Sequence, residues 1–542
     1  MKSPTRLSII ACLANLSLAR HIPASPRPCN DSVALHLPPN AVGASIPHSN
    51  SYSSFSIEPA FWVEFFGNLS SPNTLTFDLL ARIVEHGGNP IIRPGGITMD
   101  SMIFDASAQG VVRSLSPTGG VYRTTVGPEY YQSWDLFPAS TKFVSTLNFG
   151  NNSLEIAEGL AVASVEYQSK RVLYFELGNE PTNYPAARWN DSTAAYVQQW
   201  KNWTHQIDLV VNQTSNGTAA FPSRRWFASS ATTDESGLNV RPADLIPAGI
   251  DSAGQVAEYS IHSYQFATCD PARAALATIP NILNHTLLTS YADTEIMPSA
   301  NAALASGVPW VIGEFNSIAC SGNPNVSDTF AQALWTLDMQ LIYAVRNASA
   351  VHLHQGATLV FQSSNQVNTA GNNGEPGFST YDFAYPETTS KRGEKRSLPG
   401  YLALLFMAEA LAVNGTRVQE VALPNEVDAE SFVAYAFYVG DRLSKLALVN
   451  LAPYYANSTS DSTVSLDISH HSHAHRGWAK RMTSPFVDEK DSAKATWAGQ
   501  SFENGTASGG LNIEEVGQGS VVRVRGSEAL LVFFDQDEVY GL

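Results

Sequence analysis

The most constraining feature of the sequence is an alternation of short β-favouring runs and longer helix-compatible segments between Asn50 and about Tyr385. Such an alternation is typical of parallel strands joined by crossover helices. The predicted strands are Ser54–Glu58, Pro90–Arg93, Lys142–Asn148, Val172–Leu177, Arg225–Ser229, Tyr259–His262, Trp310–Gly313 and Val351–His354. The predicted helices among them are Leu75–Glu85, Leu154–Tyr167, Thr193–Val211 and Phe330–Ala344.

Eight such units favour closure into a (β/α)8 barrel, also called a TIM barrel, over residues 50–413, with Ser397–Val413 as the last helix. An open, doubly wound sheet is the main alternative. The sequence contains neither the G-x-G-x-x-G nor the G-K-S/T phosphate loop that would support that alternative.

The chain changes character after residue 413. Alternating or apolar runs separated by turns predict a C-terminal antiparallel β-sandwich over residues 414–542. Its predicted strands are Arg417–Leu423, Ser431–Val439, Leu443–Leu451, Thr463–Ile468, Val521–Arg525 and Ala529–Phe534. The alternating run Ser32–Leu37, within the N-terminal segment 20–49, is expected to add a strand to this sandwich.

The N-terminus has the features of a secretory signal over residues 1–19. Lys2 and Arg6 precede an apolar stretch, Leu7–Ala19, that is too short to span a bilayer and ends in small residues. Charged residues make up only 15% of the chain, whereas thirteen Asn-x-Ser/Thr sequons occur between Asn30 and Asn504. We therefore expect a secreted, extracellular glycoprotein without a membrane anchor. The net charge of −17 argues against nucleic acid and anionic membranes as partners.

Three cysteines remain after removal of the signal segment. Cys269 and Cys320 each follow an apolar, strand-like run, and we predict that they form a disulfide while Cys29 stays free. The alternative is three free thiols. A histidine-rich tract at Ser469–His475 lacks Cys or acidic ligands, so an exposed loop is favoured over a metal site.

Two glutamates directly follow predicted barrel strands. Glu180 follows Val172–Leu177 in the sequence Gly-Asn-Glu-Pro, and Glu314 follows the strand that ends at Gly313. Functional groups of a parallel barrel lie at the carboxyl ends of its strands, so strands four and seven would hold these carboxylates across the barrel mouth. A separation of about 5 Å between two carboxyl groups is what a retaining glycosidase requires.

The sequence context assigns different roles to the two carboxylates. Asn179 can hold a sugar 2-hydroxyl next to Glu180, which is expected to be the general acid/base. Glu314 is expected to be the nucleophile, kept ionised by a hydrogen bond from Tyr264 on the sixth strand. A glutamate at the end of a strand more commonly serves as a cap or an ion-pair partner. Taken alone, Glu180 or Glu314 could have such a structural role instead. This chemistry needs no metal and no cofactor.

The segments Gly178–Pro181, His262-x-Tyr264 and Gly313-Glu314 resemble the clan of (β/α)8 retaining glycosidases with catalytic glutamates on strands four and seven. Three further segments, Phe55–Glu58, Arg93–Asp100 and Leu147–Gly150, are similar to glycoside hydrolase family 79, which contains β-glucuronidases and heparanase. The barrel followed by a sandwich fits the same family.

The resemblance implies a set of substrate contacts. Asp100, Asn148 and Asn179 would bind the sugar, and Glu58 would lie at the pocket floor. Backbone amides of the Ala319–Gly322 loop, which includes Cys320, and a tyrosine after strand eight would hold a glucuronate carboxylate. That loop departs from the expected aromatic–Gly-Gly pattern, and the tyrosine is Tyr385 or Tyr381.

These expectations favour an exo-acting retaining β-glucuronidase that removes terminal glucuronic acid or its 4-O-methyl form from glycans. The alternatives are a related β-glycosidase for a neutral sugar, such as a glucosidase or xylosidase, and a non-catalytic carbohydrate-binding protein on the same fold. Endo-cleavage of a sulfated polymer is disfavoured because it calls for a basic cleft. The oligomeric state is left open.

Overall fold

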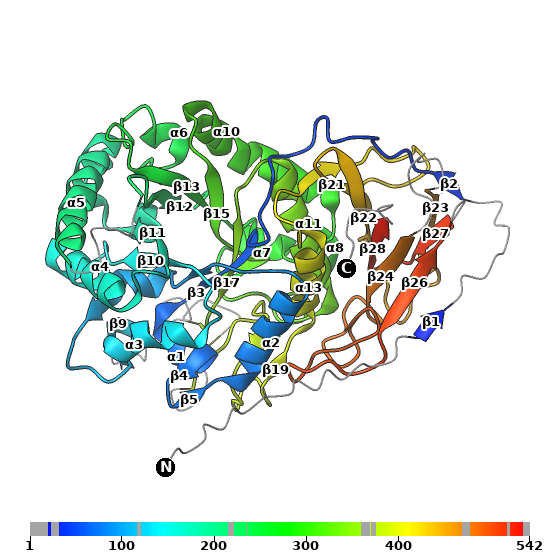
Figure 1. Cartoon of the computed structure of the whole chain (residues 1–542), viewed down its shortest axis with the longest axis horizontal. Coiled ribbons are helices and arrows are strands. Elements are labelled where there is room, and N and C mark those ends of the chain that lie inside the picture. The colour runs from blue at the N-terminus through cyan, green and yellow to red at the C-terminus, as the bar shows by residue number, and fades with distance from the viewer. Residues whose placement is uncertain are drawn as a thin grey trace, which may run out of the picture.

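The computed structural model describes residues 20–22, 32–115, 121–214, 222–234, 236–358, 369, 375–468, 477–517 and 521–534. Two regions stand side by side: a ring of helices around parallel strands, and an antiparallel β region that carries the C-terminal part of the chain (Figure 1). The predicted signal segment, Cys29 and the Ser469–His475 tract lie outside the described residues. Within the described part of the chain, we find no helix with the length and apolar character needed to cross a bilayer.

The first region is a closed barrel of eight parallel strands, which confirms the predicted (β/α)8 fold. Each strand begins within three residues of its predicted start. In chain order the strands are β3 (Ser53–Ile57), β6 (Ile92–Arg93), β10 (Phe143–Leu147), β11 (Val172–Leu177), β12 (Trp226–Ala231), β13 (Val256–Ser263), β15 (Trp310–Phe315) and β17 (Val351–Gln355). β17 pairs with β3 in parallel and thereby closes the ring.

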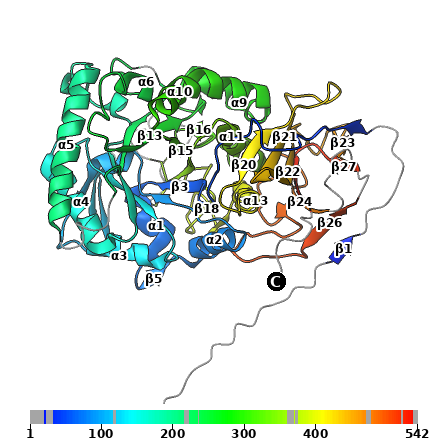
Figure 2. The same ribbon diagram turned by 45° about the horizontal axis from the view of Figure 1, so that its top comes forward.

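The strand sequences explain this arrangement. Every residue of β12 and β15 is buried, because barrel strands face a packed interior on one side and helices on the other. The helices predicted between the strands form as α2 (Thr74–Glu85), α4 (Leu154–Gln168), α5 (Thr193–Gln213) and α11 (Phe330–Val345). The helices lie outside the barrel, with α4 and α5 at its far side from the C-terminal region (Figure 2).

Two parts of the barrel differ from the prediction. The segment predicted as a helix over Ser397–Val413 begins with a short strand, β19 (Arg396–Ser397), and the α-helix α13 covers only Leu402–Ala410. Pro399 and Gly400 explain the late start, because proline is tolerated only in the first turn of a helix. An unpredicted three-stranded sheet, β7 (Met102–Phe104), β8 (Val111–Leu115) and β9 (Val121–Val126), follows β6.

The C-terminal region is built as the predicted antiparallel sandwich. One sheet has the order β1-β26-β24-β28-β22-β21-β20, and a second has the order β2-β23-β27. Its strands are β20 (Arg417–Glu420), β21 (Phe432–Val439), β22 (Arg442–Asn450), β23 (Val464–Asp467), β24 (Gly477–Thr483), β26 (Asn512–Val516), β27 (Val521–Val524) and β28 (Glu528–Phe534). β24 and β26 were not predicted.

The N-terminal part of the chain contributes to both sheets of the sandwich. β1 (Arg20–Ile22) pairs in parallel with β26, and β2 (Val33–Ala34) pairs in parallel with β23. The blue N-terminal strands lie beside orange and red C-terminal ones (Figure 1). The chain therefore visits the sandwich before it enters the barrel.

The helices between the two regions are buried on all sides. Every residue of α13, and all of α11 from Phe330 to Ala344, is buried. A polar network joins α13 to the sandwich: Glu409 accepts hydrogen bonds from Lys480 (2.7 Å) and from the Trp497 indole (2.9 Å). Because these buried surfaces are extensive and Glu409 is paired across the junction, the sandwich supports the barrel.

Candidate active site

Glu180 lies at the carboxyl end of β11, where the strand turns abruptly. Gly178 has φ 83°, and a Cβ there would come within 2.7 Å of the Tyr184 hydroxyl, so only glycine fits. Glu180 itself is left-handed, with φ 48° and ψ 61°, and its N–H donates to the Ser230 carbonyl at 2.8 Å. A strained backbone held by a neighbouring strand is a frequent feature of functional sites, and here it directs the carboxyl group into the barrel mouth.

Glu314 lies within β15, directly after Gly313. Its Oε1 accepts a hydrogen bond from the Tyr264 hydroxyl at 2.9 Å, and its Oε2 accepts one from Arg93 Nη1 at 3.0 Å. The side chain is 7% exposed. A carboxylate with two such donors is fixed in orientation, and one of them is cationic.

Glu180 and Glu314 face each other at the carboxyl-terminal end of the barrel. One carboxylate oxygen of Glu180, one of Glu314 and a ring nitrogen of His262 all lie within 4.8 Å of one another. His262 Nδ1 is 3.0 Å from Glu180 Oε1. Such a trio has the donor types of a cation site, but a carboxyl pair at this spacing also meets the requirement of a retaining glycosidase.

The surroundings push the pKa values of the pair apart. Burial and the charge of Glu314 raise the pKa of Glu180 well above its usual value, so its carboxyl group holds a proton at rest. Burial also acts to raise the pKa of Glu314, but the ring of His354, that of His262, the Arg93 guanidinium and the Tyr264 hydroxyl together lower it to about 2. One group is therefore a proton donor and the other an anion at the same pH.

The two histidines do not carry charge at neutral pH. Burial lowers the pKa of both His262 and His354 to about 4. Above that pH the anionic form of Glu314 depends on Arg93 and Tyr264.

Arg93 is the central cation of the site and is completely buried. Besides Glu314 it donates to Ser56 Oγ (2.8 Å), Asn179 Oδ1 (3.0 Å) and Glu176. Its bond to Asn179 fixes which end of that amide is the oxygen, so the NH₂ group remains as the donor. Arg93 thus neutralises two buried carboxylates and orients the residue next to Glu180.

A cavity of about 190 Å³ opens at these residues. Of the residues predicted from sequence, it is lined by Glu58, Asn179, Glu180, Tyr264, Cys269, Glu314 and Cys320. Glu58 accepts hydrogen bonds from the backbone N–H groups of Ile97 and Thr98, both at 3.0 Å, and burial raises its pKa to about 8. A neutral Glu58 can donate a hydrogen bond to a hydroxyl at the cavity floor.

Three residues predicted to bind substrate do not line this cavity. Asp100 does not line the cavity; its carboxylate accepts backbone N–H groups of Gly150 (3.1 Å) and Asn179 (3.2 Å), so it supports the loop behind Asn179. Asn148 is buried and uses its amide on the Met102 carbonyl and the Asn151 N–H. Tyr385, in β18 (Ala384–Tyr385), packs against the guanidinium groups of Arg392 and Arg396.

The structure places Tyr381, the other tyrosine considered after strand eight, in the cavity wall. It also adds lining residues that sequence reasoning did not single out. They are Ile97, Asn183, Thr232, Thr233, Asp234, Arg273, His354, Gly356, Ala357 and Ser379, whereas Ala319 and Ser321 belong to the loop that the sequence predicted. Several of these residues directly follow barrel strands, and that position could have identified them from the sequence as candidate site residues.

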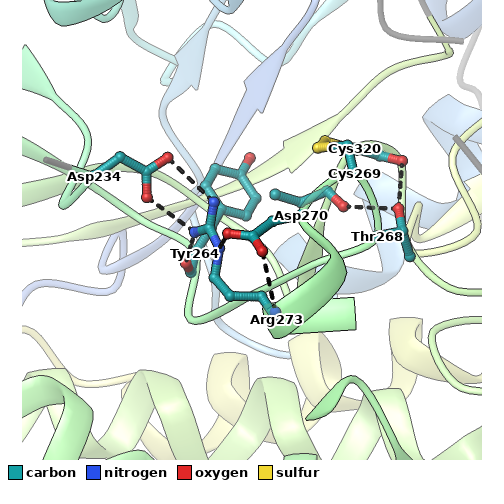
Figure 3. Close-up of a disulfide and its surroundings, with 8 residues drawn as sticks. Asp234, Tyr264, Thr268, Cys269, Asp270, Arg273 and Cys320 are labelled. Carbon is teal, nitrogen blue, oxygen red and sulfur yellow. Dashed lines mark hydrogen bonds and ion pairs between the residues drawn. A yellow bond between two sulfur atoms is a disulfide. The ribbon is translucent and has the colours of Figure 1, made fainter. Parts of the chain in front are cut away.

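The predicted disulfide between Cys269 and Cys320 is confirmed. It links the segments after β14 (Phe266–Ala267) and β16 (Ile318–Ala319), which pair with each other in parallel. Figure 3 shows the bridge beside Thr268, whose hydroxyl donates to the carbonyls of Ala319 and Cys320, both at 3.3 Å. Cys320 and Ser321 both have positive φ, so the bridge and these hydrogen bonds hold an unusual backbone path in the cavity wall.

Comparisons with known proteins agree with this architecture. The glycosyl hydrolase family 79 C-terminal beta domain matches residues 434–531, and the cellulase domain of glycosyl hydrolase family 5 matches residues 151–350. A β-glucuronidase of Aspergillus niger is 29% identical over 447 residues, covering 78% of this chain and 75% of that protein. A β-glucuronidase of Neurospora crassa is 24% identical over 462 residues, covering 80% and 78%.

Among solved structures, a 4-O-α-L-rhamnosyl-β-D-glucuronidase from Fusarium oxysporum 12S has the same fold. The TM-score is 0.74 at 22% identity, and the match covers 93% of this chain and 100% of that one. The similarity therefore extends over barrel and sandwich together.

Proposed function

We propose that the chain is a member of glycoside hydrolase family 79 and an exo-acting retaining β-glucuronidase, with Glu180 as acid/base and Glu314 as nucleophile. The observation that carries the proposal is the carboxyl pair, with oxygens within 4.8 Å and pKa values shifted in opposite directions. Two β-glucuronidases among its relatives favour glucuronic acid as the terminal sugar, and we extend the proposal to its 4-O-methyl form.

The first chemical step uses both glutamates. An Oε atom of Glu314 attacks the anomeric carbon while Glu180 gives its proton to the departing glycosidic oxygen. The product is a covalent glycosyl–enzyme ester and a free alcohol. Tyr264 and Arg93 keep the nucleophile ionised and aimed until the bond forms.

The second step reverses these roles. Glu180, now ionised, takes a proton from a water molecule, and the resulting hydroxide attacks the anomeric carbon from the face that the alcohol left. Glu314 departs as a carboxylate, and the sugar keeps its β configuration.

Several groups would bind the terminal sugar. The NH₂ group of Asn179 is a donor beside Glu180, and protonated Glu58 is a donor at the floor. Tyr381 and the Ala319–Gly322 loop line the wall where a glucuronate carboxylate would lie. Neutral hydroxyl and amide donors suit an acidic protein, since they bind a carboxylate without a net positive site.

The remaining sequence expectations complete the proposal. We propose that residues 1–19 direct secretion, that residues 20–49 and 414–542 support the catalytic barrel of residues 50–413, and that the sequons carry glycans. The partner is then a glucuronide-bearing glycan outside the cell. The low charge content of 15% fits a surface that depends on glycans for solubility.

A retaining β-glycosidase for a neutral sugar is the second candidate. One observation favours it: Arg273, at the rim, is the only Lys or Arg among the described cavity-lining residues, and Arg93 behind the floor is already paired with Glu314 and Glu176. A panel of aryl β-glycosides (glucuronide, glucoside and xyloside) separates the two, and activity confined to the glucoside would reject the glucuronidase.

Variants test the two roles. Glu314→Gln should abolish turnover of the aryl glucuronide with the fold intact by circular dichroism; substantial remaining activity rules out Glu314 as nucleophile. Glu180→Ala should be partly rescued by azide on an activated substrate and give the β-glycosyl azide. An α-glycosyl azide would instead mean inversion.

A further inference from the structure

The cavity has two ends that differ in exposure. At the floor, Glu58, Glu314, His354 and Tyr381 are each about 5% exposed. At the mouth, Asn183 and Asp234 are exposed and Arg273 is half-buried. Glu180, with a side chain 16% exposed, lies between the two ends. Since its proton goes to the glycosidic oxygen, the terminal sugar lies on the floor and the leaving group lies over the mouth.

At the mouth of the cavity, three charged side chains are held together by hydrogen bonds. Arg273, in α7 (Pro271–Leu276), donates to both carboxylate oxygens of Asp234, at 2.9 Å from Nη1 and 3.3 Å from Nη2. Its Nε donates to Asp270 at 3.1 Å. Figure 3 shows the guanidinium between the two carboxylates and next to Tyr264, whose carbonyl accepts from Nη1 at 3.4 Å.

This arrangement orients Asp234 although 52% of its side chain is exposed. Each carboxylate oxygen has two lone pairs and receives one N–H group from Arg273, so acceptor capacity remains on both. A fixed, partly exposed carboxylate is suited to accept hydrogen bonds from two neighbouring hydroxyl groups. Thr232 and Thr233 add hydroxyl groups on the same side of the cavity.

The composition of the mouth restricts its ligand. Asp234 and Asp270 outnumber the single cation Arg273, so an anionic leaving group meets repulsion. The cavity-lining residues Asn183, Thr232, Thr233, Asp234 and Arg273 make the mouth polar. The aromatic rings among the described lining residues are those of Tyr264 and Tyr381, and the Tyr264 hydroxyl is directed to Glu314 at the floor. A neutral, hydroxyl-rich group matches both properties.

We propose that Asp234, held by Arg273, is a specificity-determining residue of a leaving-group subsite, and that this subsite takes a neutral, hydroxyl-bearing sugar. The proposal rests on the proposed glycosidase function and deepens it. Asp234 would contact the leaving sugar directly, whereas Arg273 is a positioning residue.

The charge of Asp234 also acts on the proton donor. Glu180 faces His262 from β13, Glu314 from β15, Arg93 from β6, and Asn183 and Asp234 from the mouth. After burial and Glu314, Asp234 is the next cause that raises the pKa of Glu180, while Arg93 lowers it. Neutralising Asp234 should therefore move the alkaline limb of kcat/KM to lower pH.

The experiment compares kcat/KM for three substrates: a 4-nitrophenyl β-glucuronide, a β-glucuronosyl-galactose disaccharide and a β-glucuronosyl-galacturonate disaccharide. Wild-type protein should prefer the neutral disaccharide to the anionic one by about tenfold, equivalent to a difference of about 1.4 kcal/mol. Asp234→Asn keeps the size of the side chain and removes its charge. It should reduce that preference to about twofold and shift the alkaline limb of the kcat/KM profile to lower pH.

Asp234→Ala should lower kcat/KM for the neutral disaccharide about tenfold and change the aryl substrate by less than about threefold, since one hydrogen-bonded contact is lost. Asp293→Ala is the matched control. Asp293 also pairs with an arginine, Arg346 at 2.7 Å, and its side chain is 54% exposed, but it does not line the cavity. This control should leave all three rates unchanged.

The outcomes separate the two proposals. An equal loss on aryl and disaccharide substrates in Asp234→Ala, or an unchanged sugar preference in Asp234→Asn, overturns the leaving-group subsite while the glucuronidase function stands. Absence of turnover of every glucuronide by folded wild-type protein overturns both.

Discussion

Replacing Tyr264 by Phe removes one hydrogen bond to the proposed nucleophile. The Tyr264 hydroxyl donates to Glu314 Oε1 at 2.9 Å, and phenylalanine keeps the ring and loses only that donor. Above about pH 4 both neighbouring histidines are neutral, so Arg93 is then the principal remaining group that favours the ionised carboxylate; below that pH the protonated histidines favour it as well.

The size of the effect follows from the chemistry of the lost bond. A hydrogen bond to a charged, buried group contributes about 1.5–3 kcal/mol, and about 1.4 kcal/mol corresponds to one pKa unit. The pKa of Glu314, about 2 in the intact site, should rise by about one to two units. Its pKa stays below that of an unfolded glutamate, so the acid limb of kcat/KM moves up to about pH 3–4 and neutral activity persists.

The assay is the pH dependence of kcat/KM for an aryl β-glucuronide between about pH 2.5 and 8, with circular dichroism at each pH to verify folding. Tyr435→Phe is the matched control. It also removes a 2.9 Å hydroxyl-to-carboxylate bond, from Tyr435 to Asp338 at the junction of barrel and sandwich. It should reduce stability without moving the acid limb. An unchanged limb in folded Tyr264→Phe refutes the role assigned to Tyr264.

Three further predictions concern stability. Replacing both Cys269 and Cys320 by Ser should lower the unfolding free energy by about 4 kcal/mol, from the entropy of a closed loop with a sequence separation of 51, and an unchanged denaturant midpoint contradicts this. Burial alone would lower the pKa of His285, but the Asp338 carboxylate raises it to about 10. The stabilisation is complete below about pH 6.5 and is lost as pH rises through 10, so the melting temperature should fall over that interval, and less so in His285→Gln. Arg93→Met should cost about 3–5 kcal/mol by leaving buried carboxylates unpaired, and a melting temperature equal to wild type rejects that account.

The barrel could be predicted because its strands have a strong local signal. β11 and β15 are apolar runs that end in Gly and polar residues, as expected for strands buried on both faces. The same signal predicts that Glu180 and Glu314 are site residues, because each lies at the carboxyl end of a barrel strand. The structure brings these two side chains together as the strand order requires.

The sandwich strands that were not predicted have a weaker pattern. β24 contains Lys480 and Arg481, and β26 contains Glu514 and Glu515. The cross-strand pair of Arg481 with Glu514 explains these charges: both oxygens of Glu514 accept from the guanidinium, at 2.8 and 2.9 Å. Such charges resemble a solvated loop until the pairing is known.

The directions of polar side chains could not be predicted, because they depend on distant backbone groups. Asp100 turns toward the N–H groups of Gly150 and Asn179 rather than toward the cavity. Tyr381 and Tyr385 are four residues apart, and only the former lines the cavity. The contact of Asp234 with Arg273 spans 39 residues and matches no periodicity.

The central claim is that Glu314 forms a covalent bond to the sugar while Glu180 handles protons. The most direct test is incubation with a 2-deoxy-2-fluoro-β-glucuronosyl fluoride, which slows hydrolysis of the glycosyl–enzyme, followed by peptide mass spectrometry. We predict a single adduct, on the peptide that contains Glu314, and its absence in Glu314→Gln. An adduct on Glu180 or another residue, or turnover of a natural glucuronide to the α anomer, would contradict the mechanism.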